Sequence, residues 1–178
     1  MKNLFLTAAI VFAASCANAL AAQNTDAAAK PAPPCSSELF HQFDFWVGEW
    51  EVFGPDGKKA GDNAISVEEY GCLLVEHWTN TGGGTGQSYN FVDLATNQWR
   101  QVWVSKGAVI DYSGGLNDDG AMQLEGEIAY PTGMSAPFKG TWTLNENGTV
   151  TQYFQQYDSE KDIWNDWFTG TYKKKSAN

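Results

Sequence analysis

The chain has 178 residues and a formal net charge of −10 at pH 7, from 11 Lys and Arg against 21 Asp and Glu. This length suits one ordinary domain. Binding to a nucleic-acid backbone needs clustered cations, and the chain has a single arginine, Arg100. The composition therefore argues against nucleic-acid binding, and the acidity mainly favours solubility.

The first 21 residues have the pattern of a secretory signal peptide. Lys2 gives a positive start, an apolar run follows at 4–14, and Ala-Leu-Ala at 19–21 is a small-x-small cleavage pattern. The apolar run is too short to span a bilayer, and no later segment resembles a membrane span. We expect a periplasmic or secreted protein with a disordered leader at 22–35, which is rich in Ala, Gln, Asn and Pro.

The three cysteines leave two questions open. Cys16 ends the apolar run, where bacterial lipoproteins carry an acylated cysteine, although Ala13 stands where such sequences usually have Leu. Lipidation there would tether the protein to a membrane. In an exported protein Cys35 and Cys72 either remain free thiols or form a disulfide. A bridge would stabilise the fold by about 3–4 kcal/mol in the chain-entropy model.

The remaining chain predicts strands after one short helix. Ser36 can cap that helix, with Glu38 in its first turn. From Gly48 onward, runs rich in β-branched and aromatic residues alternate with turns rich in Gly, Asn and Asp. We predict about ten antiparallel strands, at 48–54, 61–70, 72–80, 86–93, 97–104, 108–115, 121–129, 136–144, 149–157 and 163–173.

Sequential hairpins leave two exposed sheet edges, and closing the sheet removes them. The predicted fold is an all-β, antiparallel up-and-down β-barrel that forms a single domain over 36–178, with the short N-terminal helix closing one end. A two-sheet sandwich is the alternative. A barrel of this size leaves an interior that can hold a small ligand.

Alternation along the strands assigns side chains to faces. Trp99, Gln101 and Trp103 form the more apolar face of their strand and are placed inside. Glu76 shares a face with Leu74 and Trp78, but the opposite face of that strand is also apolar, so alternation alone does not decide which side is inside. If Glu76 points inward, it is a carboxylate among indoles, and burial would raise its pKa. Such a group suits acid/base work or a polar ligand group; a satisfied structural glutamate is the alternative.

Other polar residues give weaker signals. Arg100 is expected on the surface beside a carboxylate. His41 and His77 stand alone, without a nucleophile nearby in sequence, although His77 is a conceivable haem ligand. No Cys, His and Asp grouping has the spacing of a metal site. We therefore expect no metal and no cofactor.

Five segments together suggest a relationship: Phe-Asp-Phe-Trp-Val-Gly-Glu-Trp at 43–50, Gly-Cys-Leu-Leu-Val-Glu-His-Trp at 71–78, Gly-Gln-Ser-Tyr-Asn-Phe at 86–91, Trp-Arg-Gln-Val-Trp-Val at 99–104, and Phe-Thr-Gly-Thr-Tyr at 168–172. Over residues 38–173 the chain resembles a family of exported bacterial proteins known only as a domain of unknown function. That family is grouped with lipocalin-like, or calycin, barrels.

The resemblance implies a closed barrel and brings no established activity. It implies inward placement of Glu76, Trp78, Trp99, Gln101 and Trp103, and it favours Ser88 and Asn90 inside as well. Haem-binding barrels of similar shape carry a histidine late in the chain, whereas this sequence has none after His77.

Three functions are compatible with these features. The first is an exported protein that binds a small apolar or amphipathic molecule through Glu76, Trp78, Ser88, Asn90, Trp99, Gln101, Trp103 and Gln152. The second is a calycin-like decarboxylase or isomerase that uses Glu76 with Tyr89 or Tyr153. The third is an interaction module with a filled barrel and outward aromatic residues, namely Tyr89, Phe91 and Tyr153.

Overall fold

The computed structural model describes residues 32–176. The predicted signal peptide, Cys16 and the leader up to residue 31 lie outside these residues. The described chain forms ten strands: β1 (Gly48–Phe53), β2 (Lys59–Glu68), β3 (Leu73–Asn80), β4 (Thr85–Asp93), β5 (Gln98–Ser105), β6 (Val109–Leu116), β7 (Met122–Ala129), β8 (Ser135–Leu144), β9 (Val150–Asp158) and β10 (Ile163–Lys174). Three short 3₁₀ helices accompany them: η1 (Glu38–His41), η2 (Asp44–Trp46) and η3 (Glu69–Gly71).

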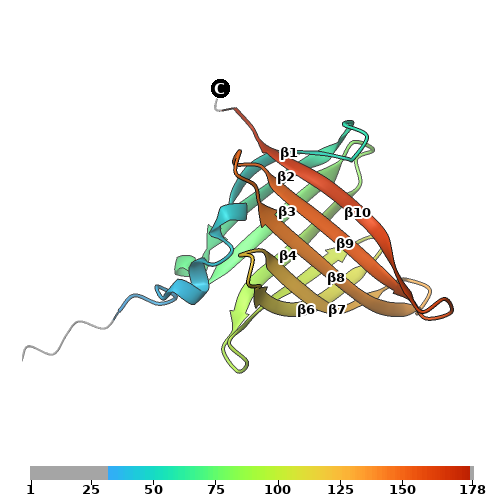
Figure 1. The fold of residues 1–178 in the computed structure, drawn as a ribbon. Coiled ribbons are helices and arrows are strands. Elements are labelled where there is room, and N and C mark those ends of the chain that lie inside the picture. Colours follow the sequence, from blue (N-terminus) through green and yellow to red (C-terminus); the bar gives the residue numbers. More distant parts are fainter. Residues whose placement is uncertain (1–31, 177–178) are drawn as a thin grey trace, which may run out of the picture. The chain divides into compact units, whose positions relative to one another are not determined.

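The strands form a closed antiparallel barrel (Figure 1). Each strand pairs with its neighbours in sequence, and β1 pairs with β10 to close the sheet. The predicted up-and-down barrel is therefore confirmed, and the sandwich is excluded. No helix within 32–176 has both the length and the apolar character needed to cross a membrane.

Tight turns set the strand boundaries. At Asn117 and Asn145, the backbone carbonyl accepts a hydrogen bond from the glycine three residues later, Gly120 at 3.0 Å and Gly148 at 2.9 Å. Both glycines have a φ of 77°, which residues with a Cβ adopt only at a cost. The Asn117 carboxamide oxygen also accepts from the backbone N–H of Ala121. These turn residues explain why the hairpins could be located from sequence.

One predicted strand, at 61–70, is placed two residues too late at both ends, since it begins at Lys59. The strand predicted at 61–70 ends at Glu68, and helix η3 takes up the next three residues. Tyr70 has a φ of 59° there, followed by Gly71 at 92°. This left-handed pair turns the chain too sharply for a strand to continue.

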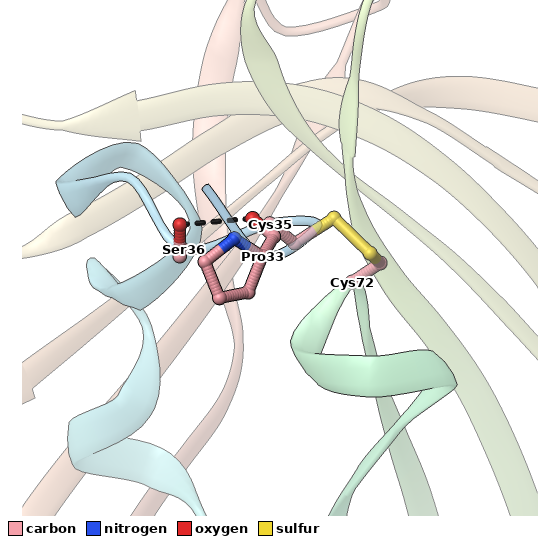
Figure 2. Close-up of a disulfide and its surroundings, with 4 residues drawn as sticks. All are labelled: Pro33, Cys35, Ser36 and Cys72. Carbon is pink, nitrogen blue, oxygen red and sulfur yellow. Dashed lines mark hydrogen bonds between the residues drawn. A yellow bond between two sulfur atoms is a disulfide. The ribbon is translucent and has the colours of Figure 1, made fainter. Parts of the chain in front are cut away.

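The N-terminal helix differs from its prediction as well. It is two 3₁₀ helices, and the residue before η1 is Ser37, whose side chain makes no capping hydrogen bond. The predicted cap at Ser36 is wrong, because its hydroxyl donates instead to the backbone carbonyl of Pro33 at 2.9 Å (Figure 2).

Aromatic side chains from this segment pack against the barrel interior. Phe43 and Trp46 have no exposed surface, and their rings stack at 4.9 Å between centroids. Phe43 also makes edge contacts with Trp99 at 5.7 Å and with Trp142 at 5.3 Å. The Trp50 indole donates to the Trp46 carbonyl at 2.8 Å. Stacked and edge contacts of this kind add to the burial of the rings themselves.

A disulfide links the beginning of this segment to the barrel wall. Cys35 and Cys72 are bonded, with 5.1 Å between their Cα atoms and a sequence separation of 37 (Figure 2). Cys72 lies between η3 and β3. The structure thus decides for the bridge over two free thiols.

Candidate functional site

The barrel interior contains a cavity of about 280 Å³ that is partly open to solvent. It is lined by residues from six strands, namely β2, β3, β5, β6, β9 and β10. The lining consists of Ala60, Glu76, Trp78, Asn80, Gln101, Trp103, Ile110, Tyr112, Gln152, Phe154, Trp167, Phe168 and Tyr172. Aromatic rings predominate, and a small set of polar groups lies among them.

The cavity and the N-terminal aromatic residues occupy different levels of the barrel. Trp99 and Trp103 point inward from the same strand, β5, but four residues separate them, or about 13 Å along a strand. Trp99 packs on Phe43, and its indole donates to the Leu39 carbonyl at 3.0 Å. Trp103 lines the cavity instead. Neither Phe43 nor any residue of η1 or η2 is part of the lining.

Glycines in the barrel wall make room for the aromatic lining. A Cβ added at Gly86 would overlap the Trp103 indole, and one at Gly61 would overlap Trp78. The same holds for Gly140 beneath Phe154 and for Gly170 beneath Phe168. Because these rings occupy the space of missing side chains, they lie against the wall and leave the centre of the barrel open.

A bulge in β10 adds a second aromatic residue at the cavity. The pairing of β10 with β9 shifts register between Asp166 and Phe168, so Trp167 has no partner across the ladder. Both Trp167 and Phe168 then line the cavity, although alternation would send one of them outward. Trp167 remains 47% exposed and makes an edge contact with Phe138 at 5.4 Å.

Glu76 is the carboxylate at the cavity wall, and it is 3% exposed. Its Oε1 atom accepts a hydrogen bond of 2.6 Å from the Asn63 amide, and its Oε2 atom accepts one of 2.6 Å from the Ser88 hydroxyl. Each carboxylate oxygen therefore keeps capacity for a further hydrogen bond.

Two branches of a buried hydrogen-bond network meet at Glu76. On one side Tyr112 donates to Gln101, Gln101 to Asn90, Asn90 to Ser88, and Ser88 to the carboxylate. Every donor in this branch is directed toward Glu76. Such directed chains strengthen each member and fix its orientation.

On the other side the Asn63 amide also donates to the Tyr172 hydroxyl at 3.1 Å, and Tyr172 donates to Gln152 at 2.9 Å. Within the described chain the Asn63 carboxamide oxygen has no partner. A half-turn of this amide would offer that oxygen to a protonated Glu76, so both protonation states can be satisfied.

Burial raises the pKa of Glu76 from its ordinary value of 4.5 to about 7, although the hydrogen bonds from Ser88 and Asn63 oppose the rise. Burial likewise raises the pKa of Tyr112 and of Tyr172 well above 10, and the nearby charge of Glu76 adds to both shifts. Near neutral pH, Glu76 is thus the cavity group whose charge changes.

The raised pKa predicts that Glu76 makes stability depend on pH. Between pH 4.5 and about 7 the folded state holds a proton that the unfolded state has lost. Stability therefore falls as pH rises through this window, by about 3 kcal/mol in total. We expect Glu76→Gln to remove this loss between pH 5 and pH 8, as measured by urea unfolding with tryptophan fluorescence.

Glu125→Gln is the matched control, because it removes a carboxylate from an exposed position on β7. We expect this variant to keep the wild-type pH dependence. Parallel stability profiles for the wild type and Glu76→Gln would contradict the prediction.

The structure brings together five of the eight residues predicted for ligand binding, namely Glu76, Trp78, Gln101, Trp103 and Gln152. Ser88 and Asn90 point inward but lie behind Glu76 in the network and are not part of the lining. Trp99 lies among the N-terminal aromatic residues, away from the cavity.

The tyrosines proposed as catalytic partners of Glu76 are on the wrong side of the barrel wall. Tyr89 is 52% exposed, and the Tyr153 hydroxyl donates to the exposed Asp166 carboxylate. His77 is also exposed on the outer face. Arg100 forms the expected surface ion pair, a two-pronged contact with Asp111.

Sequence reasoning missed three members of the hydrogen-bond network around Glu76, namely Asn63, Tyr112 and Tyr172. A signal existed for each of them. Asn63 is two residues from Gly61 and from Ile65, so it shares their face of β2, and Tyr112 shares a face of β6 with Ile110. Tyr172 ends a segment used for the family resemblance. Alternation would have placed all three inside the barrel.

No protein-family model matches the chain, and no curated protein matches it. Within residues 32–176, no group of three or more His, Cys, Asp or Glu side chains is arranged to hold a metal ion. The cavity is therefore the feature of the described chain that bears on function.

Proposed function

We propose that this protein is an exported, lipocalin-like β-barrel that binds a small, mainly apolar molecule in its interior. The observation that carries this proposal is the cavity itself, of about 280 Å³, with an aromatic wall and a few polar groups. Ligand pockets in proteins begin at about 300 Å³ and share this composition. The ligand is accordingly small, with few atoms beyond a single ring.

The polar groups supply orientation. The Gln152 amide nitrogen makes no hydrogen bond within the described chain and has two N–H groups to offer. Glu76, Gln101 and the two tyrosines are held by the network, so their positions are set before a ligand arrives. Preorganised polar groups reduce the entropy cost of binding.

The remaining parts of the proposal rest on the sequence and on the disulfide. The N-terminal pattern predicts export, and a disulfide suits an oxidising compartment. The aromatic residues of η1 and η2 would close the end of the barrel away from the cavity. The closed antiparallel barrel supports a lipocalin-like assignment, as the resemblance of residues 38–173 implies.

Narrowing the cavity should weaken ligand binding. An added Cβ at Gly86 would push the Trp103 indole toward the cavity centre. We expect Gly86→Ala to weaken binding of benzyl alcohol, a neutral probe, by at least about tenfold, or 1.4 kcal/mol. Ligand-detected NMR and tryptophan fluorescence would measure the affinity.

Gly115→Ala is the matched control, because a Cβ at this β6 position meets nothing within 4 Å. It should bind benzyl alcohol like the wild type. Native mass spectrometry of protein purified from the cells that make it would detect a natural ligand that co-purifies with it. Protein that binds neither benzyl alcohol nor any co-purifying molecule would contradict the proposal.

A second candidate is an enzyme of the decarboxylase or isomerase type, and the pKa of Glu76 near 7 favours it. A group with such a pKa suits general acid/base catalysis. Tyr112 and Tyr172 line the cavity with it and would replace the tyrosines first considered. Turnover of a bound ligand, lost in Glu76→Gln with binding retained, would distinguish this candidate.

A further inference from the structure

The charges around the cavity are unbalanced. Glu76 lines it, whereas no Lys, Arg or His does. None of the ion pairs in the described chain includes Glu76. Its two hydrogen-bond donors, Asn63 and Ser88, are neutral. An ionised Glu76 is thus a buried charge without a counter-ion, and buried charges in proteins are normally paired.

The rest of the wall suits a cation. Aromatic rings attract positive charge through their π faces, tryptophan most strongly. Trp78 and Trp103 line the cavity on neighbouring parts of the wall, because each is inward-facing and Gly86 pairs with Trp78 on one side and lies beneath Trp103. Tyr112 and Tyr172 add two further rings. A bound cation would therefore meet a carboxylate and several rings together.

Other charged ligands lack partners in this cavity. A carboxylate or phosphate would find no cationic side chain in the lining and would be repelled by Glu76. A neutral apolar ligand would leave Glu76 either protonated or unpaired. Only a cation both removes the unpaired charge and uses the aromatic wall.

We infer that the natural ligand is a small amphipathic ammonium compound, with its cation against Glu76 and its apolar part among the aromatic rings. This inference rests on the proposed function and specifies its ligand class. The protein's net charge of −10 would also attract such a ligand from solution.

The titratable groups that face Glu76 are Tyr112 on β6 and Tyr172 on β10, and the neighbours on β2 and β4 are the neutral Asn63 and Ser88. The pKa of both tyrosines lies well above 10, so they stay neutral near pH 7. With the Glu76 pKa near 7, the ionised fraction falls about tenfold from pH 8 to pH 6. The affinity for a cation should fall with it.

Three probes of equal size and different charge test the inference: benzylammonium, benzyl alcohol and benzoate. Calorimetry or ligand-detected NMR would compare them on the full-length protein at pH 8 and pH 6. We expect benzylammonium to bind at least tenfold more tightly than benzyl alcohol at pH 8, with benzoate weakest. Its affinity should fall about tenfold at pH 6, and that of benzyl alcohol should not fall.

Glu76→Gln should remove both the preference for benzylammonium and its pH dependence, while it keeps binding to benzyl alcohol. Glu125→Gln should leave all affinities unchanged, because it lowers the net negative charge equally without altering the cavity. Benzyl alcohol binding as tightly as benzylammonium to the wild type would overturn the inference and leave the proposed function intact. If none of the probes binds, the proposed function fails as well.

Discussion

Replacing Phe43 with alanine is expected to lower the free energy of unfolding by about 4 kcal/mol. Phe43 has no exposed surface and contacts four other aromatic rings, those of Phe45, Trp46, Trp99 and Trp142. The space left by the missing ring is bordered by Trp99 and Trp142, which are held on strands β5 and β8, and by the buried Trp46. The site therefore cannot collapse fully, and the cost includes a residual cavity as well as lost burial.

Urea unfolding followed by circular dichroism would measure this loss, with Phe91→Ala as the control. Phe91 is the same residue type on β4, but it is only partly buried on the outer face. We expect the control to lose less than about 1.5 kcal/mol, in proportion to its smaller buried surface. Equal losses from the two variants would contradict the expectation that the fully buried Phe43 contributes more to stability than the partly buried Phe91.

Phe43→Ala should leave the affinity for benzyl alcohol unchanged under conditions where the protein stays folded. Phe43 does not line the cavity, and its partner Trp99 lies at the opposite end of β5 from Trp103. We therefore expect the aromatic residues around Phe43 to stabilise the fold without affecting ligand binding in the cavity.

The strands could be predicted from sequence because their signals are local. Turn residues such as Gly120 and Gly148 mark the hairpins by conformations that other residues avoid. Alternation then places Gln101 on the inner face. For Glu76 both faces of the strand carry apolar residues, so its inward placement came from the family resemblance instead. Closure follows from the need to pair both edges of the sheet.

The level of a residue along the barrel axis could not be predicted in the same way. Alternation treats Trp99 and Trp103 alike, since both have the same parity on one strand. The difference between them comes from a segment more than fifty residues earlier, which supplies Leu39 and Phe43 as partners for Trp99. Contacts over such distances in sequence leave no local pattern.

The bulge in β10 is a second feature beyond local reasoning. It reverses the parity of the strand at Trp167, so a rule of strict alternation assigns the residues on one side of the bulge to the wrong face. Adjacent aromatic residues at 167–168 are the one hint of it in the sequence. The hydrogen bonds of the polar network could not be predicted either. Pairs such as Asn63 and Glu76 depend on the register between strands, which the sequence pattern does not give.

Loss of the disulfide is expected to lower the free energy of unfolding by about 3–4 kcal/mol. The bond joins residues 37 apart in sequence, so it removes much conformational freedom from the unfolded chain. The closed loop contains η1, η2, β1, β2 and η3. The double variant Cys35→Ser, Cys72→Ser would give this loss without leaving a free thiol, and added reductant should not change its stability further.

Combining this double variant with Phe43→Ala would show where the disulfide acts. If it acts mainly on the unfolded chain, the two losses should add to within about 0.5 kcal/mol. A combined loss well below the sum would mean that the disulfide holds Phe43 in place in the folded state, because removing one would already weaken the other. In either case the affinity for benzyl alcohol should stay the same, since Cys35, Cys72 and Phe43 all lie outside the cavity lining.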